Sequence, residues 1–201
     1  EKDGDVDSSS HESDVHVTVK AAVNLSFEDV KPGAWYYENV RKACVDGLLK
    51  GKSPDRFCPG ETMTVAEAVT LACRLNQLSQ SGVIDLANGG DVWYSTYMEY
   101  ALKNGIIVSD LSDIAGEPVT RGLFAEIFAS ALPDECFSEV KKVTDGSIPD
   151  VEAGSEYEAD IYKLYRAGVL TGYEDGSFHP DGLITRAEAA VVAVRMESLN
   201  K

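Results

Sequence analysis

Basic residues are scarce in this sequence, and long apolar runs are absent. The 201 residues include 18 Lys and Arg against 34 Asp and Glu, which gives a net charge of −16. Such a charge repels nucleic acid and anionic membrane surfaces. No apolar run approaches the roughly 18 to 20 residues that a bilayer span needs, and the longest candidate, Ala189 to Val194, lies within an amphipathic pattern. We therefore expect no nucleic-acid partner and no membrane insertion.

Histidine and cysteine are also few, which argues against a catalytic or metal centre. His11 and His16 fall in a polar tail and His179 in a turn, so no Ser/His or Cys/His constellation is visible. No two of the abundant carboxylates stand out as a glycosidase pair. No cysteines are spaced as CxxC, which disfavours structural zinc. We expect no enzyme activity, no metal and no cofactor. Buried free thiols are favoured over one disulfide, for which Cys44 and Cys73 are the first pair to test.

The N-terminal stretch is polar and carries no basic-then-apolar leader. We expect any secretion signal to have been removed or to lie outside this sequence. Residues 1–24, with "DSSSHESD" at their centre, hold too little apolar surface to order themselves. They are interpreted as a flexible acidic linker that continues from a cargo domain N-terminal to residue 1.

After this linker the chain repeats itself, as two sets of landmarks show. "FEDV", "VIDL" and "IPDV" place an Asp at positions that are 56 and then 65 residues apart: Asp29, Asp85 and Asp150. "MTVAE", "VTRGL" and "ITRAE" place a Thr at the same two separations: Thr64, Thr120 and Thr185. The common register predicts three repeats, over residues 25–80 (repeat 1), 81–142 (repeat 2) and 143–201 (repeat 3).

Each repeat predicts two helices separated by a glycine and an extended loop. The first helices are expected to begin near Trp35, Trp93 and Glu156, with one apolar face each, and to end at Gly47, Gly105 and Gly168. The second helices carry apolar residues four, seven, eight and eleven positions after the Thr: Ala68, Leu71, Ala72, Leu75, Phe124, Ile127, Phe128, Ala131, Ala189, Val192, Ala193 and Met196. Such two-helix units cannot cover their own apolar faces, so the copies should pack on one another.

Repeat 3, "IPDV…GYEDGSFHPDGLITRAEAA", and repeat 1, "FEDV…F.P…T.AE", resemble S-layer homology (SLH) repeats. Repeat 2 is similar mainly through "DVWY", "GI" and "VTRGLFA". The resemblance implies an all-α, three-pronged domain of three helix-loop-helix repeats with pseudo-threefold symmetry. It also implies an extracellular location in the cell wall or S-layer. Such domains anchor secreted proteins by binding secondary cell-wall polysaccharide, often pyruvylated, in grooves between repeats.

The "TRAE" motif combines a helix cap with an unexpected cation. Thr185 and Glu188 have the spacing of a capping box, and Thr64 and Glu67 repeat it. Arg186, however, would face the positive end of the helix dipole. Beside free backbone amides it would form an anion site, and the resemblance implies that this Arg contacts the ligand. The alternative is an ion pair with an acidic residue of the neighbouring repeat.

The other copies of the motif are incomplete, so we expect grooves of unequal binding capacity. Arg121 is the equivalent arginine in repeat 2, where Leu123 replaces the capping Glu. Repeat 1 has Val65 in place of the arginine. The alternative function is an SLH-like protein-interaction or structural module that has lost glycan binding.

Four further residues are candidate glycan contacts. Trp35 and Trp93 share one position and could stack on sugar rings, or could pack in the core. Asp29 and Asp150 could bond sugar hydroxyls, although an Asp before a helix more often caps or turns the chain.

Overall fold

The computed structural model describes residues 27–199, so the proposed linker lies outside the described residues. Within this range the chain forms two short 3-10 helices, Ser112–Ile114 and Asp134–Cys136, and six α-helices: α1 Tyr37–Val45, α2 Val65–Ser81, α3 Ser95–Lys103, α4 Arg121–Ala129, α5 Glu158–Arg166 and α6 Arg186–Leu199. The range contains isolated β-bridges and no strand. The prediction of an all-α fold is confirmed. None of these helices is both long and apolar enough to cross a membrane.

The glycines end the first helices as expected. Gly47, Gly105 and Gly168 have φ of +77°, +67° and +72°, a conformation that glycine adopts without the steric cost a side chain brings. Leu48 N–H donates to Ala43 O at 2.8 Å and Gly47 N–H to Cys44 O at 3.1 Å, which is the Schellman pattern. The first helices begin two residues later than predicted, with α1 at Tyr37.

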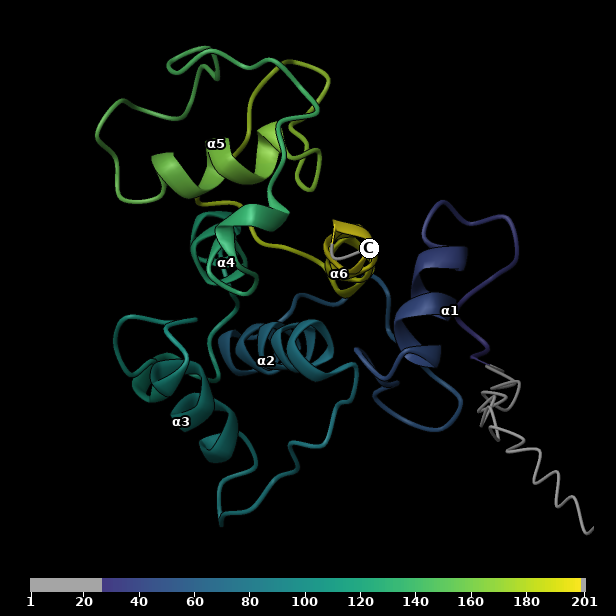
Figure 1. The fold of residues 1–201 in the computed structure, drawn as a ribbon. Helices are drawn as coiled ribbons and strands as arrows, with labels where there is room; N and C mark the ends of the chain where they lie inside the picture. The colour runs from purple at the N-terminus through teal and green to yellow at the C-terminus, as the bar shows by residue number, and fades with distance from the viewer. Residues whose placement is uncertain (1–26, 200–201) are drawn as a thin grey trace, which may run out of the picture.

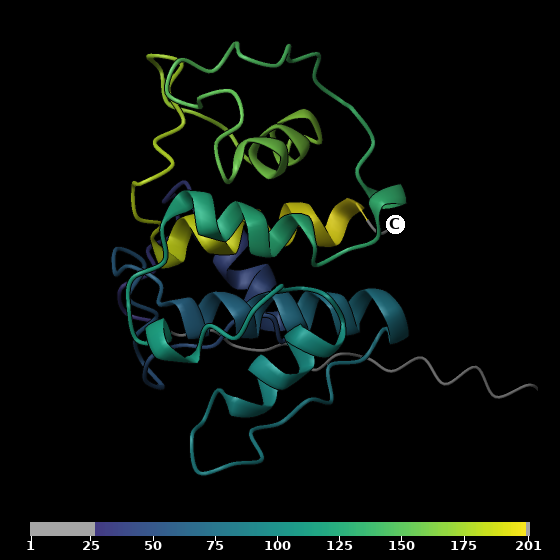
Figure 2. The same cartoon turned by 90° about the vertical axis from the view of Figure 1, so that its left-hand side faces the viewer.

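The two helices of one repeat do not form a hairpin with each other. Figure 1 shows α2, α4 and α6 at the centre, with α1, α3 and α5 around them. The outer helix α3 packs on α2, α5 packs on α4, and α1 packs on α6. Each outer helix therefore packs against the second helix of the preceding repeat, and the pairing of α1 with α6 closes the ring. Figure 2 shows the same three pairs from the side.

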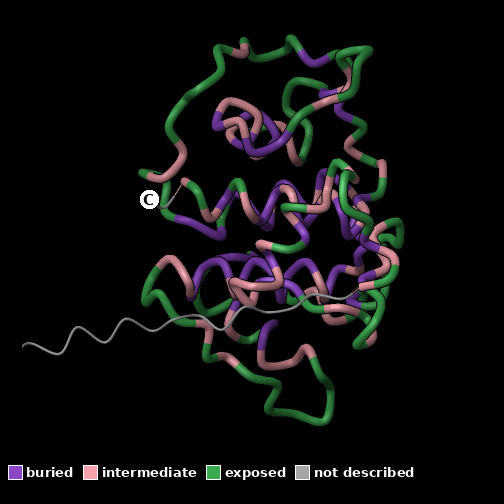
Figure 3. Tube along the Cα trace, turned by 90° about the vertical axis from the view of Figure 1, so that its right-hand side faces the viewer, coloured by how far each residue is buried: buried purple, intermediate pink, exposed green. Residues whose placement is uncertain are grey.

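The predicted apolar stripes of the second helices form the centre of this arrangement. All twelve residues of the stripes are buried, and the buried segments of Figure 3 run along these helices. Leu102, near the end of α3 and beside the buried Ala101, is 39% exposed. Phe57 and Phe178, from matching loops of repeats 1 and 3, are fully buried.

The segments just before the second helices join the three repeats in a ring. Isolated bridges pair Thr64 with Pro118, Thr120 with Leu183, and Thr185 with Thr62. The first amide of each second helix then donates to the next repeat: Val65 to Glu117 O at 2.9 Å, Arg121 to Gly182 O at 2.7 Å, and Arg186 to Glu61 O at 2.9 Å. One contact recurs three times, and it brings the three motifs together at one end of the central helices.

The candidate disulfide between Cys44 and Cys73 is not formed in this structure. None of Cys44, Cys58 and Cys73 is in a disulfide. Burial raises the pKa of the Cys73 thiol to about 12. It raises the pKa of Cys44 to about 11, although the charge of Arg186 works in the opposite direction. Residues 27–199 contain no group of three or more His, Cys, Asp or Glu that could hold a metal ion.

Candidate functional site

Both motif arginines are buried between repeats. Arg186 is 3% exposed; its Nε donates to Phe57 O at 2.9 Å and its Nη2 to Lys50 O at 2.7 Å. Its guanidinium carbon lies 4.7 Å from the centre of the Phe57 ring, where the ring quadrupole attracts a cation. Each arginine thus extends from the start of its own helix across the loop of the next repeat.

Arg121 makes the same contacts one repeat earlier, from repeat 2 to the loop of repeat 3. It is 6% exposed, and its Nε donates to Phe178 O at 2.9 Å and its Nη2 to Thr171 O at 3.0 Å. Its guanidinium lies 4.6 Å from the centre of the Phe178 ring.

The expectation that these arginines lie beside free helix amides is wrong. The first two amides of α6 donate to repeat 1: Arg186 to Glu61 O at 2.9 Å, and Ala187 to Pro59 O at 3.0 Å. The third, Glu188 N–H, donates to Thr185 Oγ1 at 3.3 Å. Any anion bound here must therefore be held by side chains.

The charge partners of the two arginines differ. Arg186 Nη1 lies 3.6 Å from Glu67 Oε1 of the neighbouring repeat, and Lys52 Nζ contacts the same oxygen at 2.6 Å. The predicted alternative of an ion pair therefore holds for Arg186. No carboxylate among residues 27–199 forms an ion pair with Arg121. Within residues 27–199 the buried guanidinium of Arg121 has carbonyl and aromatic partners, and no carboxylate pairs with it.

The capping residues are placed as their spacing suggests. Thr64 N–H donates to Glu67 Oε2 at 3.1 Å and Glu67 N–H to Thr64 Oγ1 at 3.3 Å, which completes a capping box. Thr185 and Glu188 make the same pair of bonds at 2.8 and 3.3 Å. In α4 only Leu123 N–H to Thr120 Oγ1 remains, at 3.2 Å. The start of α4 thus lacks one of the two bonds, as the substitution of the Glu by Leu123 requires.

Asp29 and Asp150 hold loops rather than line a groove. Phe178 N–H and His179 N–H both donate to the Asp150 carboxylate at 2.7 Å. Burial works to raise the pKa of Asp150, but these backbone bonds outweigh it, and the pKa lies below its usual value. His179 adopts φ of +58° to make this bond, and Cys58 adopts +59° at the matching place. The bracing fixes the carbonyl oxygen that receives the arginine.

The same bracing occurs in repeat 1. Phe57 N–H and Cys58 N–H donate to Asp29 at 2.9 and 2.8 Å. Against the effect of burial, these bonds and the charge of Arg56 lower the pKa of Asp29. Both carboxylates therefore act on the grooves indirectly, by holding the loop that supplies an acceptor to the arginine.

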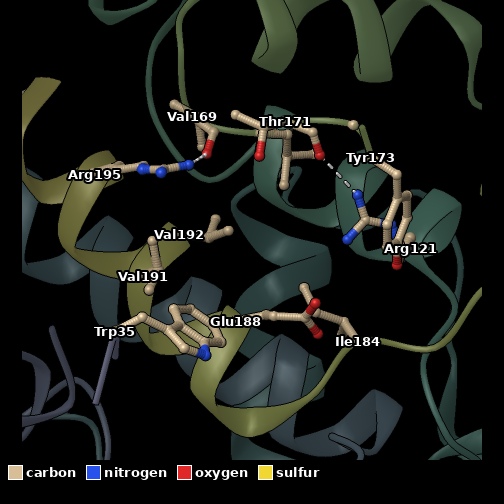
Figure 4. A pocket seen from close by; sticks show the side chains of 12 residues that line it. Trp35, Arg121, Val169, Thr171, Tyr173, Ile184, Glu188, Val191, Val192 and Arg195 are labelled. Carbon is tan, nitrogen blue, oxygen red and sulfur yellow. Dashed lines mark hydrogen bonds between the residues drawn. The ribbon is translucent and has the colours of Figure 1, made fainter. Parts of the chain in front are cut away.

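Three grooves lie where the repeats meet, and equivalent positions line them. Groove A encloses about 200 Å³ and is lined by Trp35, Arg121, residues 169–173, Ile184, Glu188, Val191, Val192 and Arg195 (Figure 4). Groove B encloses about 160 Å³ and is lined by residues 48–52, Glu67, Thr70, Leu71, Arg74, Trp93 and Arg186. Groove C encloses about 260 Å³ and is lined by residues 106–109, Leu111, Ile114, Leu123, Glu126, Ile127, Glu156 and Tyr157.

Every groove takes residues from more than one repeat. Groove A combines the second helix and loop of repeat 3, Arg121 of repeat 2 and Trp35 of repeat 1. Groove B combines repeat 1 with Arg186 of repeat 3 and Trp93 of repeat 2. A single repeat therefore cannot form any of these sites.

The two tryptophans lie at the groove rims with their rings open to solvent. Trp35 is 65% exposed and Trp93 44% exposed, so the core-packing alternative does not hold. Each meets the following tyrosine edge-on, Tyr36 at 5.3 Å and Tyr94 at 5.5 Å between ring centres. Their free faces can stack on the apolar side of a sugar ring.

Two further arginines, which were not among the predicted site residues, line grooves A and B. Arg195 Nη1 donates to Val169 O at 2.9 Å across groove A, opposite Arg121 (Figure 4). Arg74 Nη1 makes the equivalent bond to Leu48 O at 3.0 Å in groove B. Both lie ten residues after the motif Thr, where repeat 2 has Ser130. An arginine at this position in two of the three repeats is the sequence pattern that could have identified these residues.

Groove C has the opposite electrostatic character. Val65 and Ser130 stand where the other grooves have arginines, and Glu156 stands where they have tryptophan. Burial, and then the negative charges of Asp160 and Glu156, raise the pKa of Glu126. This groove repels anions.

Comparison with known proteins finds a matching family. The family model for the S-layer homology domain matches residues 26–69 and 147–190, which fall in repeats 1 and 3. The chain is 29% identical over 57% of its length to the Surface-layer 125 kDa protein of Lysinibacillus sphaericus. It is 25% identical over 84% of its length to Exoglucanase XynX of Acetivibrio thermocellus, and 25% identical over 87% to S-layer protein sap of Bacillus anthracis.

The chain spans only 10%, 16% and 21% of these three relatives. The matched domain is a non-catalytic anchoring module, and the match to the exoglucanase covers a small part of that enzyme. Residues 26–69 and 147–190 are therefore identified as S-layer homology repeats, which supports an S-layer homology domain of a bacterial cell-surface protein.

Proposed function

We propose that the chain anchors its protein to the cell wall by binding a carboxylate-bearing secondary cell-wall polysaccharide in grooves A and B. Polymers with ketal-linked pyruvate are included in this class. The observation that carries the proposal is the buried guanidinium of Arg121, which has no carboxylate partner among residues 27–199. A buried charge is costly unless it is paired. A carboxylate of the ligand supplies the missing partner.

The hydrogen bonds of Arg121 leave one direction open for that ligand. Nε and Nη2 donate to Phe178 O and Thr171 O, so the guanidinium is held in place and Nη1 remains to donate. Arg195 on the opposite wall adds a second cation, against the single carboxylate of Glu188. A rigid donor inside a partly dry groove binds an anion more strongly than a mobile surface lysine does.

Groove B fits the same class of ligand with a different charge arrangement. Its charged lining residues are Lys50, Lys52, Arg74 and Arg186 against the carboxylate of Glu67. The lining is therefore net positive, although Glu67 already pairs with Arg186 and Lys52. In both grooves an exposed tryptophan at the rim supplies a face for the sugar ring.

The test is binding of the protein to purified cell-wall sacculi, with and without removal of the secondary polymer, followed by calorimetry with polymer fragments. Trp35→Ala is the first groove A variant, because a 65% exposed side chain contributes little to folding. Arg121→Ala is the second. Arg41→Ala is the matched control, since Arg41 is exposed on α1 outside all three grooves and its loss changes the net charge equally.

We expect wild type and Arg41→Ala to bind alike, and only when the polymer is present. Trp35→Ala should weaken binding by about 5- to 50-fold, the scale of about 1–2.5 kcal/mol for a stacking aromatic. Retention on sacculi that is indifferent to the polymer would contradict the proposal. That result would favour the alternative, a protein-interaction module on the SLH scaffold.

We also propose that the chain is the wall-binding part of a longer protein. Support comes from the relatives, which are matched over 10% to 21% of their own lengths. A cargo domain N-terminal to residues 1–24 would then be held at the wall. Mass analysis of the protein released from the cell surface by polymer hydrolysis tests this: release of a species no larger than 21.7 kDa contradicts it.

A further inference from the structure

Groove B contains a buried hydroxyl that the fold does not use. Thr70, on the second turn of α2, is 6% exposed and lines this groove. Its Oγ1 has less than 1 Å² of accessible surface and makes no hydrogen bond within residues 27–199. A helical threonine ordinarily satisfies its hydroxyl by donating to the carbonyl oxygen one turn earlier, and Thr70 does not. Leaving a buried hydroxyl unpaired destabilises a fold.

The sister grooves carry different chemistry at the same place. Thr70 lies six residues after Thr64, and the corresponding positions are Val191 in groove A and Glu126 in groove C. All three residues line their own groove. This position is therefore part of the wall in each groove. It carries a hydroxyl in groove B, an aliphatic side chain in groove A and a carboxylate in groove C.

The neighbours of Thr70 do not offer it a better partner. Arg74, four residues later on α2, is already engaged: its Nη1 donates to Leu48 O, and its Nη2 lies 3.5 Å from the hydroxyl of Tyr97. Glu67, three residues earlier, is engaged by Lys52, Arg186 and the Thr64 N–H. Thr in a helix has two accessible χ1 rotamers. Rotation about χ1 moves the hydroxyl out of its buried position, and the side chain that carries it lines groove B.

We propose that Thr70 is a specificity-determining residue of groove B. On binding, its hydroxyl turns into the groove and forms a hydrogen bond with a hydroxyl or amide group of the glycan. Val191 offers no such bond, so groove A accepts the same polymer with an apolar part of the sugar at this place. This inference rests on the proposed function, and it makes the two cationic grooves selective for different faces or residues of the polymer.

The test isolates one groove at a time by calorimetry. Trp35→Ala weakens groove A and leaves groove B to be measured; Trp93→Ala does the reverse. The probe is the methyl glycoside of a hexose that carries a ketal-linked pyruvate, together with its monodeoxy analogues. Thr70→Val is the isosteric variant, Thr70→Ser restores the hydroxyl, and Thr144→Val is the control at an exposed threonine outside the grooves.

In the groove B background we expect Thr70→Val to weaken binding about 2- to 10-fold, the effect of one net hydrogen bond. The same variant should raise the melting temperature, because it removes an unpaired buried hydroxyl. Thr70→Ser should bind as wild type. One deoxy analogue should bind the protein with Thr70 more weakly than the parent glycoside does, and should bind Thr70→Val as tightly as the parent glycoside does.

Three results overturn the inference. If Thr70→Val keeps full affinity while Trp93→Ala loses groove B binding, Thr70 does not contact the ligand and the proposed function stands. If Thr70→Val lowers the melting temperature and leaves affinity unchanged, the hydroxyl has a structural role. If neither groove binds the probe or the purified polymer, both this inference and the proposed function fail.

Discussion

Replacing Asp150 by asparagine should loosen the loop that forms one wall of groove A and lower the stability of the fold, although Asp150 does not itself line that groove. The Asp150 carboxylate accepts two backbone N–H bonds, from Phe178 and His179, each of 2.7 Å. Phe178 is also the residue whose carbonyl oxygen receives Arg121 Nε at 2.9 Å. An asparagine side chain can accept only one of the two bonds, because its second polar atom is an N–H₂ donor that would face the other N–H.

The size of the effect follows from the lost charge-assisted bond. Hydrogen bonds to charged groups contribute about 1.5–3 kcal/mol. For a chain of this size, 1 kcal/mol corresponds to about 2–4 °C. Asp150→Asn should therefore lower the melting temperature by about 3–12 °C. Asp181→Asn is the matched control, because Asp181 is exposed nearby and its substitution changes the net charge equally.

The pH dependence of stability gives a second measure of the same bond. The pKa of Asp150 is lowered in the folded state. Its contribution is therefore complete above the unfolded-state value of 3.8, and it is lost as the pH falls below that value through the folded-state pKa. Denaturant unfolding between pH 6 and pH 2.5 should show a smaller loss of stability in Asp150→Asn than in wild type. Equal melting temperatures and equal acid slopes for Asp150→Asn and Asp181→Asn would refute the bracing role.

Two further substitutions test the helix starts where the repeats meet. Thr185→Ala should destabilise the fold by about 1 kcal/mol through loss of the cap on α6, and Thr185→Ser should restore most of it in thermal unfolding; equal stability of the two variants would contradict the capping role. Gly122→Ala should destabilise the fold, because the new Cβ would lie 2.3 Å from the Tyr157 ring. Gly60→Ala is the control, since nothing lies within 4 Å of a Cβ at that position. A Gly122→Ala protein as stable as Gly60→Ala would show that Tyr157 moves freely.

Local features of the fold were predictable because local chemistry determines them. The period of the apolar residues identified the second helices and their twelve buried side chains. Gly47, Gly105 and Gly168 marked the ends of the first helices, because a left-handed turn there favours glycine. Leu102 was the exception, since the exposure of a residue near a helix end depends on what the next loop covers.

The contacts between repeats were not predictable from the same patterns. Arg186 donates to Lys50 O and Phe57 O, which lie 136 and 129 residues away and are backbone acceptors. A carbonyl oxygen leaves no trace in the amino-acid sequence. For the same reason the first amides of α6 were predicted to be free, although they donate to Glu61 O and Pro59 O.

The ring arrangement explains how repeat 2 can diverge while the grooves around it stay complete. The second helix of repeat 2 lines groove C. In this helix Leu123 replaces the capping Glu, and Ser130 stands at the position of Arg74 and Arg195 in the other repeats. The residues that repeat 2 supplies to other grooves are retained: Arg121 lies in groove A and Trp93 in groove B. Grooves A and B each take their arginine, their loop and their tryptophan from three different repeats. A substitution in one repeat therefore changes single positions of a groove and leaves the rest of that groove intact. Groove C accordingly combines the changes Val65, Leu123 and Glu156 from all three repeats, and anion binding should be lost there alone.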